Sequence, residues 1–315
     1  MAEKVLVALS GGVDSSVAAL LLKEQGYDVI GAHLKLWDSA DEDSSSCDNG
    51  PHCSLDSIID CRFVCDKIDV PFYVINMSEQ FRDSIIENFV SEYKHGRTPN
   101  PCIKCNSDIK WAALLNKASE LACDFIATGH YAFVEKNAIG RYQIRRGIDE
   151  TRDQSYVLWD ISQQALAKTL MPLGGLRKTD VRQIAIDNGL KTANNKESRE
   201  ICFVPDDDYH RFLKEWCEKN NESFLPGDIV HENGTVLGRH EGTAFYTIGQ
   251  RRGLGIAHPT PLYVHRIESD TNRVIVGNDD KLYCDTLEAE NVNWVAIEGI
   301  ISPIKARVKI RYQHG

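Results

Sequence analysis

The sequence predicts an α/β protein with a doubly wound parallel sheet, followed by a β-rich central domain and a partial C-terminal β-barrel. Two observations predict the sheet. Short apolar runs alternate with segments of helical length between residues 4 and 129, as in βαβ units whose strands are covered on both faces. A glycine-rich turn ends the first apolar run and opens the first helix. The β-rich part is predicted from hairpin signals beyond residue 205.

The strands and helices of the first part follow from local patterns. Lys4–Leu9 is a continuous apolar run typical of a buried parallel strand, and residues 16–25 form a helix that Gly26 ends. The same reasoning predicts strands at 29–36, 72–75 and 125–129 and helices at 55–68, 80–95 and 107–115. A strand, a helix and a strand in succession imply a right-handed parallel unit.

The second part changes character after Pro205. An amphipathic helix is predicted over 208–220, and Asn233-Gly234 predicts a hairpin between 229–230 and 236–237. A second hairpin joins 262–267 to 274–276. We therefore expect three domains, over residues 1–205, 206–283 and 284–315.

Composition narrows the class of protein. The 315 residues carry a formal net charge of −10, which argues against indiscriminate nucleic-acid binding but leaves room for a basic face. No apolar run is long enough to span a bilayer, and the N-terminus has no signal-peptide pattern. We therefore expect a cytoplasmic protein with no membrane partner. The 10 cysteines are then expected to be free, metal-binding or catalytic rather than a disulfide framework.

The turn after the first strand is a candidate phosphate-binding loop. Residues 9–16 read LSGGVDSS, in which glycines let the backbone approach an anion and the following helix presents free N–H groups. The loop has no lysine, so it is not a Walker A loop. It also lacks the Gly-x-Gly-x-x-Gly spacing of a dinucleotide-binding fingerprint. The alternative is an ordinary tight turn capped by Asp14 or Ser15. The full string at the end of a first strand favours phosphate binding.

A second candidate site lies in TPNPCIKCNSDIKW, residues 98–111. The prolines stiffen the backbone as it enters a helix, and Cys102 and Cys105 lie at that entry. The helix dipole together with Lys104 and Lys110 predicts lowered thiol pKa values. The alternatives are half of a structural zinc site or a redox pair.

Longer strings then resemble a known family. SGGVDSSVAALLL resembles the pyrophosphate loop (PP-loop) of ATP pyrophosphatases, which cleave ATP between its α and β phosphates. The strings GRTPNPCIKCN, ATGHYA, DQSYVLW, ESREICF and GQRRGLGI occur in the order and spacing of the tRNA-specific 2-thiouridylases of MnmA type. The resemblance covers essentially the whole chain.

The resemblance implies an ATP-dependent sulfurtransferase that adenylates the C2 oxygen of the wobble uridine in tRNA and replaces it with sulfur. It implies Cys105 as the nucleophile and Cys202 as the carrier of a persulfide. ATP contacts are implied at Ala8, Leu9, Ser10, Gly11, Gly12, Val13, Asp14, Ser15, Leu34 and Gly129, and tRNA contacts at Asn100, Pro101, Cys102, Arg152, Asp153, Gln154, Arg311 and Tyr312. The implied cofactors are ATP and Mg²⁺. The implied partners are tRNAs for Lys, Glu and Gln and a sulfur-relay protein or cysteine desulfurase.

Two departures from the family pattern matter. Many members carry aspartate where this chain has Cys102, which here creates a Cys-x-x-Cys pair. With Cys202 the three thiols could hold a [4Fe–4S] cluster with one open iron, so cluster-dependent sulfur transfer stands beside the persulfide route. The family also continues beyond KIRYQHG, so the last β-domain is expected to be incomplete.

The end of the chain carries an alternating charge pattern. Lys305, Arg307, Lys309 and Arg311 alternate with apolar residues, which in a strand places four cations on one face. This face is either solvated or, as we favour, a contact for RNA phosphates. Two rival functions stay open: a PP-loop ATP pyrophosphatase acting on a small molecule, and an RNA-binding module whose nucleotide loop is vestigial.

Overall fold

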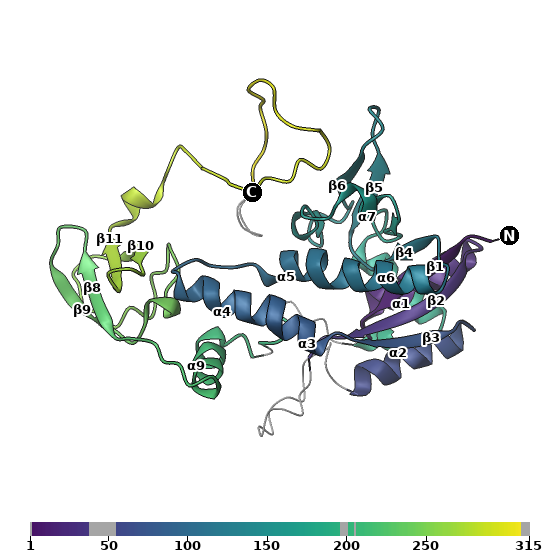
Figure 1. Ribbon diagram of the computed structural model, residues 1–315, viewed down its shortest axis with the longest axis horizontal. Coiled ribbons are helices and arrows are strands. Elements are labelled where there is room, and N and C mark those ends of the chain that lie inside the picture. The colour runs from purple at the N-terminus through teal and green to yellow at the C-terminus, as the bar shows by residue number, and fades with distance from the viewer. Residues whose placement is uncertain (1, 38–54, 196–200, 205, 310–315) are drawn as a thin grey trace. The chain divides into compact units, whose positions relative to one another are not determined.

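The chain divides into two units in the computed structural model, which describes residues 2–37, 55–195, 201–204 and 206–309 (Figure 1). The first unit comprises residues 1–82, 102–205 and 293–315. The second comprises residues 83–101 and 206–292. The candidate phosphate loop and Cys102, Cys105 and Cys202 all belong to the first unit.

A parallel sheet forms the centre of the first unit. Its order is β3-β2-β1-β4-β7 in the described part of the chain, and every neighbouring pair is parallel. The strands are β1 (Lys4–Leu9), β2 (Asp28–Lys35), β3 (Phe72–Asn76), β4 (Phe125–Ala127) and β7 (Thr169–Leu170). The chain order reverses between β1 and β4, and ligands of open α/β sheets bind beyond the carboxyl ends of the strands at such a point.

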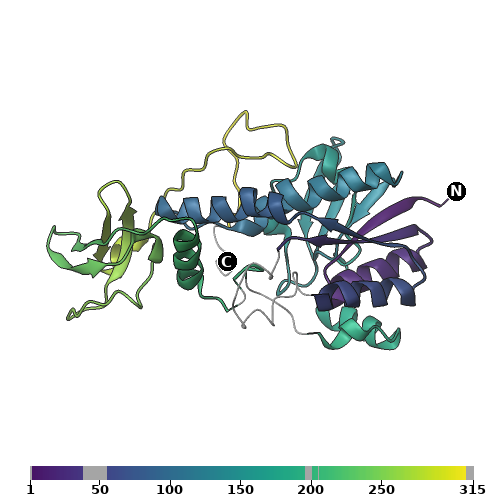
Figure 2. The ribbon, with the colours of Figure 1, turned by 60° about the horizontal axis from the view of Figure 1, so that its bottom comes forward.

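Helices cover both faces of this sheet, so the predicted doubly wound fold is confirmed. They include α1 (Val13–Glu24), α2 (Leu55–Lys67), α6 (Ala112–Glu120) and α8 (Lys178–Asp187). Val5 and Val7 pack with Ala19 and Leu22 of α1, whose opposite side packs against α8. The helix α6 contacts β1 and β4, and Figure 2 shows it across the sheet from α1 and α2.

Several connecting elements were not predicted from the sequence. The hairpin of β5 (Ala132–Lys136) and β6 (Tyr142–Arg146) is half exposed and rich in charge, so it lacks the apolar run of a buried strand. Strand β7 is only 2 residues long.

The remaining elements of this region are α3 (Ser78–Phe81), π-helix η2 (Arg82–Ile86), α5 (Pro101–Lys104), π-helix η3 (Cys105–Trp111), η4 (Ser155–Val157), α7 (Gln163–Leu166) and η5 (Lys191–Asn194).

The second unit combines helices with a small mixed sheet. Its helices are α4 (Glu87–Lys94) and α9 (Tyr209–Lys219), and Phe89 packs edge-on against Phe212. The sheet has the order β10-β11-β8-β9. Both predicted hairpins are confirmed, and Gly234 adopts a φ of 92° in the first. Its strands and short helices are β8 (Gly227–His231), β9 (Val236–His240), η6 (Thr243–Phe245), β10 (Tyr263–Glu268), β11 (Arg273–Gly277) and η7 (Asp279–Leu282).

The alternating cations at the end of the chain do not share a strand face in the described part, because residues 305–309 form no strand. Alternating charge makes a strand only where a neighbouring strand pairs with the backbone, and no pairing reaches this segment within the described residues. The preceding residues are held by side chains instead. Arg141 donates to the carbonyl oxygens of Trp294 and Val295, and Asn137 donates to that of Ala296. In the parts of the chain that the structure describes, no helix has both the length and the apolar character of a membrane span.

Candidate active site

The turn between β1 and α1 is held by serine hydroxyls. The Ser10 N–H donates to Ser15 Oγ at 3.1 Å, and the hydroxyls of Ser15 and Ser16 donate to the Gly12 carbonyl. Gly11 has a φ of 79°, and a Cβ there would lie 3.0 Å from the Ser57 backbone, so glycine is required. No side chain caps the N-terminus of α1. A compact loop with helix N–H groups at a topological switch point is suited to an anion.

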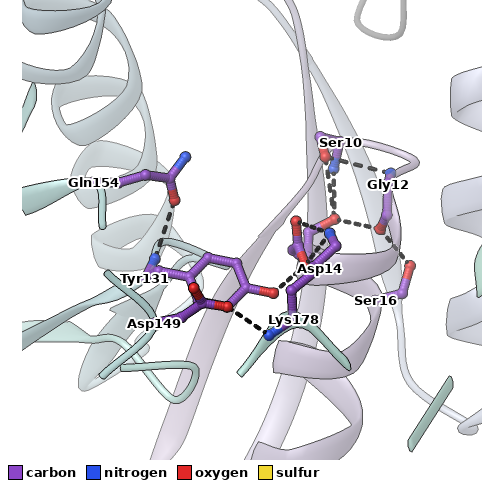
Figure 3. Close-up of polar contacts among 9 residues, drawn as sticks. Ser10, Gly12, Asp14, Ser16, Tyr131, Asp149, Gln154 and Lys178 are labelled. Carbon is purple, nitrogen blue, oxygen red and sulfur yellow. Dashed lines mark hydrogen bonds and ion pairs between the residues drawn. The ribbon is translucent and has the colours of Figure 1, made fainter. Parts of the chain in front are cut away.

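Asp14 is the charged centre of this loop (Figure 3). Its carboxylate accepts from Lys178 Nζ at 2.7 and 2.8 Å and from the Tyr131 hydroxyl at 2.7 Å. The Lys178 side chain is 10% exposed. Sequence reasoning missed Lys178, although it begins α8, where the helix dipole disfavours a cation. That unfavourable placement was a usable signal that Lys178 has another partner.

The other residues predicted to contact ATP gather at the same edge of the sheet. Gly129 follows β4, and a Cβ on it would lie 2.8 Å from the Asp14 and Ser15 backbone. Leu34 lies near the end of β2 and is buried. The predicted residues of β1, α1, β2 and the turn after β4 therefore converge, and their role in binding ATP stays a prediction.

Three thiols lie within electrostatic range of Lys110. The helix that carries two of them starts earlier than predicted, at Pro101, so Cys102 lies in α5 and Cys105 begins the π-helix η3. Burial lowers the pKa of Lys110, but the thiols of Cys105, Cys102 and Cys202 outweigh it and raise that pKa. Cys202 thus shares one cation with Cys105 despite its distance along the chain. π-Helical turns are frequent at functional sites.

The expectation of lowered thiol pKa values is wrong for Cys105 and Cys102. Burial raises the pKa of the Cys105 thiol to about 11, and Lys110 opposes this only in part. Cys102 is exposed, yet desolvation by the surrounding protein raises the pKa of its thiol as well. Lys104 contributes less than expected because it pairs with Asp108 at 2.8 Å. Removing a thiolate from water here costs more free energy than its attraction to the Lys110 ammonium contributes.

We expect iodoacetamide to alkylate Cys105 slowly at pH 8 in the folded protein and faster as the pH rises toward about 11. The raised pKa keeps the thiol protonated, and only the thiolate is nucleophilic. Peptide mass spectrometry after timed alkylation measures the rate, with the exposed Cys284 as a control for reagent quality. A Cys105 rate that reaches its plateau below pH 9 would contradict the expectation.

His130 lies beside the ring of Trp111 and within electrostatic range of Lys110. It follows Gly129, its Nδ1 is 2.9 Å from Thr128 Oγ1, and its ring lies 5.8 Å from that of Trp111. Burial, assisted by the charge of Lys110, lowers the pKa of His130 to about 3. The imidazole is therefore neutral at physiological pH and can donate or accept a hydrogen bond without adding charge.

The residues predicted to contact tRNA have varied surroundings. Asp153 is buried and accepts from the Ser155 N–H and hydroxyl. The Gln154 side chain accepts from the Tyr131 N–H at 3.0 Å, and Arg152 is partly exposed. Asn100 is exposed and Pro101 is buried at the start of α5. Arg311 and Tyr312 lie outside the described residues.

The three thiols do not fit an iron–sulfur cluster as they are arranged. Within the described ranges, no group of three histidine, cysteine, aspartate or glutamate side chains is spaced to hold a metal ion. The ammonium of Lys110 also lies among these thiols, where it stabilises negative sulfur without a metal.

Comparisons with known proteins identify the family of the chain. Residues 3–206 match the family described as "tRNA methyl transferase HUP domain", and residues 210–278 match "tRNA methyl transferase PRC-barrel domain". The fold and the loop therefore define a nucleotide-binding α/β protein of the HUP class.

Curated relatives narrow the class further. The chain is 50% identical over 318 residues to the tRNA-specific 2-thiouridylase MnmA of Geotalea uraniireducens (strain Rf4), covering 99% of this chain and 82% of that one. It is 51% identical over 314 residues to the same-named protein of Natranaerobius thermophilus, covering 99% and 84%. The chain belongs to the family of tRNA-specific 2-thiouridylases. A 4-thiouridine synthetase–RNA complex with bound ATP aligns with a TM-score of 0.40 at 14% identity, over 68% of this chain and 50% of that one, too distant to carry an argument.

Proposed function

We propose that this chain thiolates C2 of the wobble uridine through a persulfide on Cys202 and the thiol of Cys105. The chain is an ATP-dependent tRNA sulfurtransferase, as its family membership over 99% of its length establishes. One observation supports the assignment of these roles to Cys202 and Cys105. Lys110 lies in the electrostatic field of both Cys105 and Cys202, in the same unit as the phosphate loop.

The chemistry needs activation because the C2 oxygen of uracil is a poor leaving group. Attack of this oxygen on the α-phosphorus of ATP releases pyrophosphate and the N3 proton and leaves AMP on the oxygen. The N–H groups at the start of α1 are placed to stabilise the phosphate charge that develops. Mg²⁺ would neutralise phosphate charge, and it is commonly held by one or two carboxylates together with the phosphates. Asp14 is the carboxylate of the loop.

Sulfur transfer then has two steps. The terminal sulfur of the Cys202 persulfide attacks C2, and AMP leaves with its oxygen. The Cys105 thiolate next attacks the Cys202 sulfur. The S–S bond to the transferred sulfur breaks and leaves its electron pair on that sulfur. N3 regains a proton, which gives 2-thiouridine and a disulfide between Cys105 and Cys202. A thiol reductant must then reduce this disulfide before the next cycle.

Lys110 has a definite part in this scheme. Burial raises the pKa of the free Cys105 thiol to about 11 although Lys110 already opposes the rise, so the thiolate would be still less favourable without this cation. Lys110 supplies that cation to whichever of the three sulfurs is charged. The same position lets it stabilise the persulfide anion before transfer.

The particular tRNA substrates, the sulfur donor and the domain limits are proposals as well. We propose tRNAs for Lys, Glu and Gln as substrates and a sulfur-relay protein or a cysteine desulfurase as the donor. We also propose the domain limits 1–205, 206–283 and 284–315, with the phosphate loop and both reactive cysteines in the first.

Mass spectrometry of tRNA nucleosides tests the function. The protein is incubated with unmodified tRNA, ATP and a persulfide donor, and parallel reactions omit ATP or contain an analogue that cannot be cleaved between the α and β phosphates. We expect 2-thiouridine at the wobble position only with cleavable ATP, with one AMP per sulfur. Formation of a methylated uridine, or no modified base at all, would overturn the proposal.

Replacing Cys102 by aspartate separates the persulfide route from the cluster route. We expect Cys102→Asp to retain thiolation, because the persulfide route needs only Cys105 and Cys202. Anaerobically purified wild-type protein is expected to contain no stoichiometric iron and to lack visible absorption. Bound iron that is lost in Cys102→Asp together with activity would establish the cluster instead.

A further inference from the structure

Asp14 is connected to the segment 149–154 through two side chains (Figure 3). Tyr131 donates its hydroxyl to Asp14, while its own backbone bonds in both directions to Gln154, at 3.0 and 3.1 Å. Lys178 donates its ammonium to Asp14, while its backbone N–H donates to Asp149 at 3.0 Å. Two independent connections therefore run from the loop carboxylate to one short stretch of chain.

The two residues that link the loop to the segment are buried, and the hydrogen bonds that they make are partly buried. Tyr131 is 3% exposed and packs in the core with Val17 of α1, and Lys178 is 8% exposed. A Cβ on Gly147 would lie 2.9 Å from the Tyr131 carbonyl oxygen, so the backbone approaches Tyr131 closely just before the segment. Breaking a buried hydrogen bond costs more than breaking one that water replaces, so the loop and the segment are expected to move together.

Charge makes this connection sensitive to both expected ligands, ATP at the loop and tRNA at the segment 149–154. Asp14 occupies the first turn of α1, so phosphates bound there bring negative charge close to its carboxylate. The Lys178 ammonium is the cation that offsets both the Asp14 carboxylate and the charge of the bound phosphates. Its position depends on Asp149, which fixes the backbone of Lys178.

The segment 149–154 lies beside a cationic hairpin. Arg145 and Arg146 are exposed on β6, where they also lie 3.2 Å from a Glu135 oxygen and 3.9 Å from an Asp153 oxygen, and Arg152 follows in the segment itself. Arg145 stacks over Phe133 at 3.9 Å, which holds its guanidinium in place. In a chain of net charge −10, such a group of arginines suits an RNA backbone.

We propose that Tyr131 and Lys178 are positioning residues through which tRNA at 149–154 orders the phosphate loop, so that tRNA and ATP raise each other's affinity. This inference rests on the proposed function, because it takes RNA to be the ligand of the segment. Coupling between binding sites is reciprocal, so each ligand must strengthen the other by the same factor. The loop then binds ATP best when the base to be adenylated is present.

Tyr131→Phe tests the connection because it removes one hydroxyl and keeps the buried ring. The dissociation constant of a non-cleavable ATP analogue is measured by calorimetry with and without saturating unmodified tRNA. In the wild type we expect tRNA to tighten ATP binding by at least about fivefold, the lower end of typical coupling. In Tyr131→Phe only the connection through Lys178 remains, so we expect this factor to fall by at least about twofold from the wild-type value. Tyr27→Phe, a partly buried tyrosine of the same unit that packs on Phe125, is expected to keep the wild-type factor.

The outcomes are separable. Equal factors in wild type and Tyr131→Phe, or a wild-type factor of one, would overturn the connection while leaving thiolation established. A wild-type protein that neither binds nor thiolates tRNA would overturn the proposed function. If Tyr131→Phe does not fold, Gln154→Leu removes the acceptor for the Tyr131 N–H at the other end, and the same loss of coupling is expected.

Discussion

Cys202→Ser is expected to lower 2-thiouridine formation by on the order of 10³-fold or more, while tRNA-dependent pyrophosphate release continues. A serine hydroxyl cannot carry a persulfide, so the sulfur step loses its reagent. Adenylation depends on the phosphate loop, which the substitution does not touch. Nucleoside mass spectrometry and a pyrophosphate assay on the same reaction measure the two steps separately.

Cys105→Ser is expected to block the cycle one step later. The transferred sulfur then stays bonded to Cys202, so a covalent protein–tRNA adduct accumulates that a thiol reductant releases. Cys217→Ser, a buried cysteine of the second unit, is the matched control and is expected to thiolate normally. Undiminished thiolation by either Cys105→Ser or Cys202→Ser would exclude the assigned roles.

Asp14→Ala is expected to remove ATP-dependent activity and to lower the free energy of unfolding by about 1–3 kcal/mol. The substitution leaves the Lys178 ammonium without its carboxylate in a site where its side chain is only 10% exposed. We place the cost below that of a fully buried pair because the Asp14 side chain is 32% exposed. Urea denaturation measures the stability, and ATP-dependent AMP release measures the activity.

A double-mutant cycle isolates the ion pair from other effects of the substitution. Lys178→Met combined with Asp14→Ala removes both charges, so the double variant is expected to be more stable than the sum of the single losses predicts. Asp14→Asn keeps the size of the side chain and removes only its charge. Additive losses would show that the pair contributes nothing, and wild-type activity in Asp14→Ala would exclude the carboxylate from the loop's function.

The parallel core was predictable because its signals are local. Lys4–Leu9 is buried on both faces, so it appears as an unbroken apolar run in the sequence. The Asn-Gly turn at 233–234 needs a backbone conformation that glycine readily adopts, and it connects the expected strands. The hairpin β5–β6 and strand β7 were missed because one is charged and half exposed and the other is too short to show a period.

The candidate site was only partly predictable. Its loop and the pair Cys102 and Cys105 stand out by residue type and position, whereas the roles of Cys105 and Cys202 are implied by the resemblance to the family and stay predictions. The acidity of the cysteines was predicted with the wrong sign, because nearby lysines are visible in a sequence and desolvation is not. The alternating charge at 305–309 did not reveal whether a strand forms there, and no neighbouring strand pairs with it in the described part of the chain.

By itself the sequence determined the α/β core and the loop that follows its first strand, since each depends on the order of residue types within a short segment. Only the tertiary structure decided that Lys178 pairs with Asp14 across 164 positions and that Lys110 lies among three thiols. It also decided that burial raises the pKa of the Cys105 thiol despite the nearby Lys110. These properties depend on which distant segments pack together and on how much water they exclude, and neither is encoded in a local pattern.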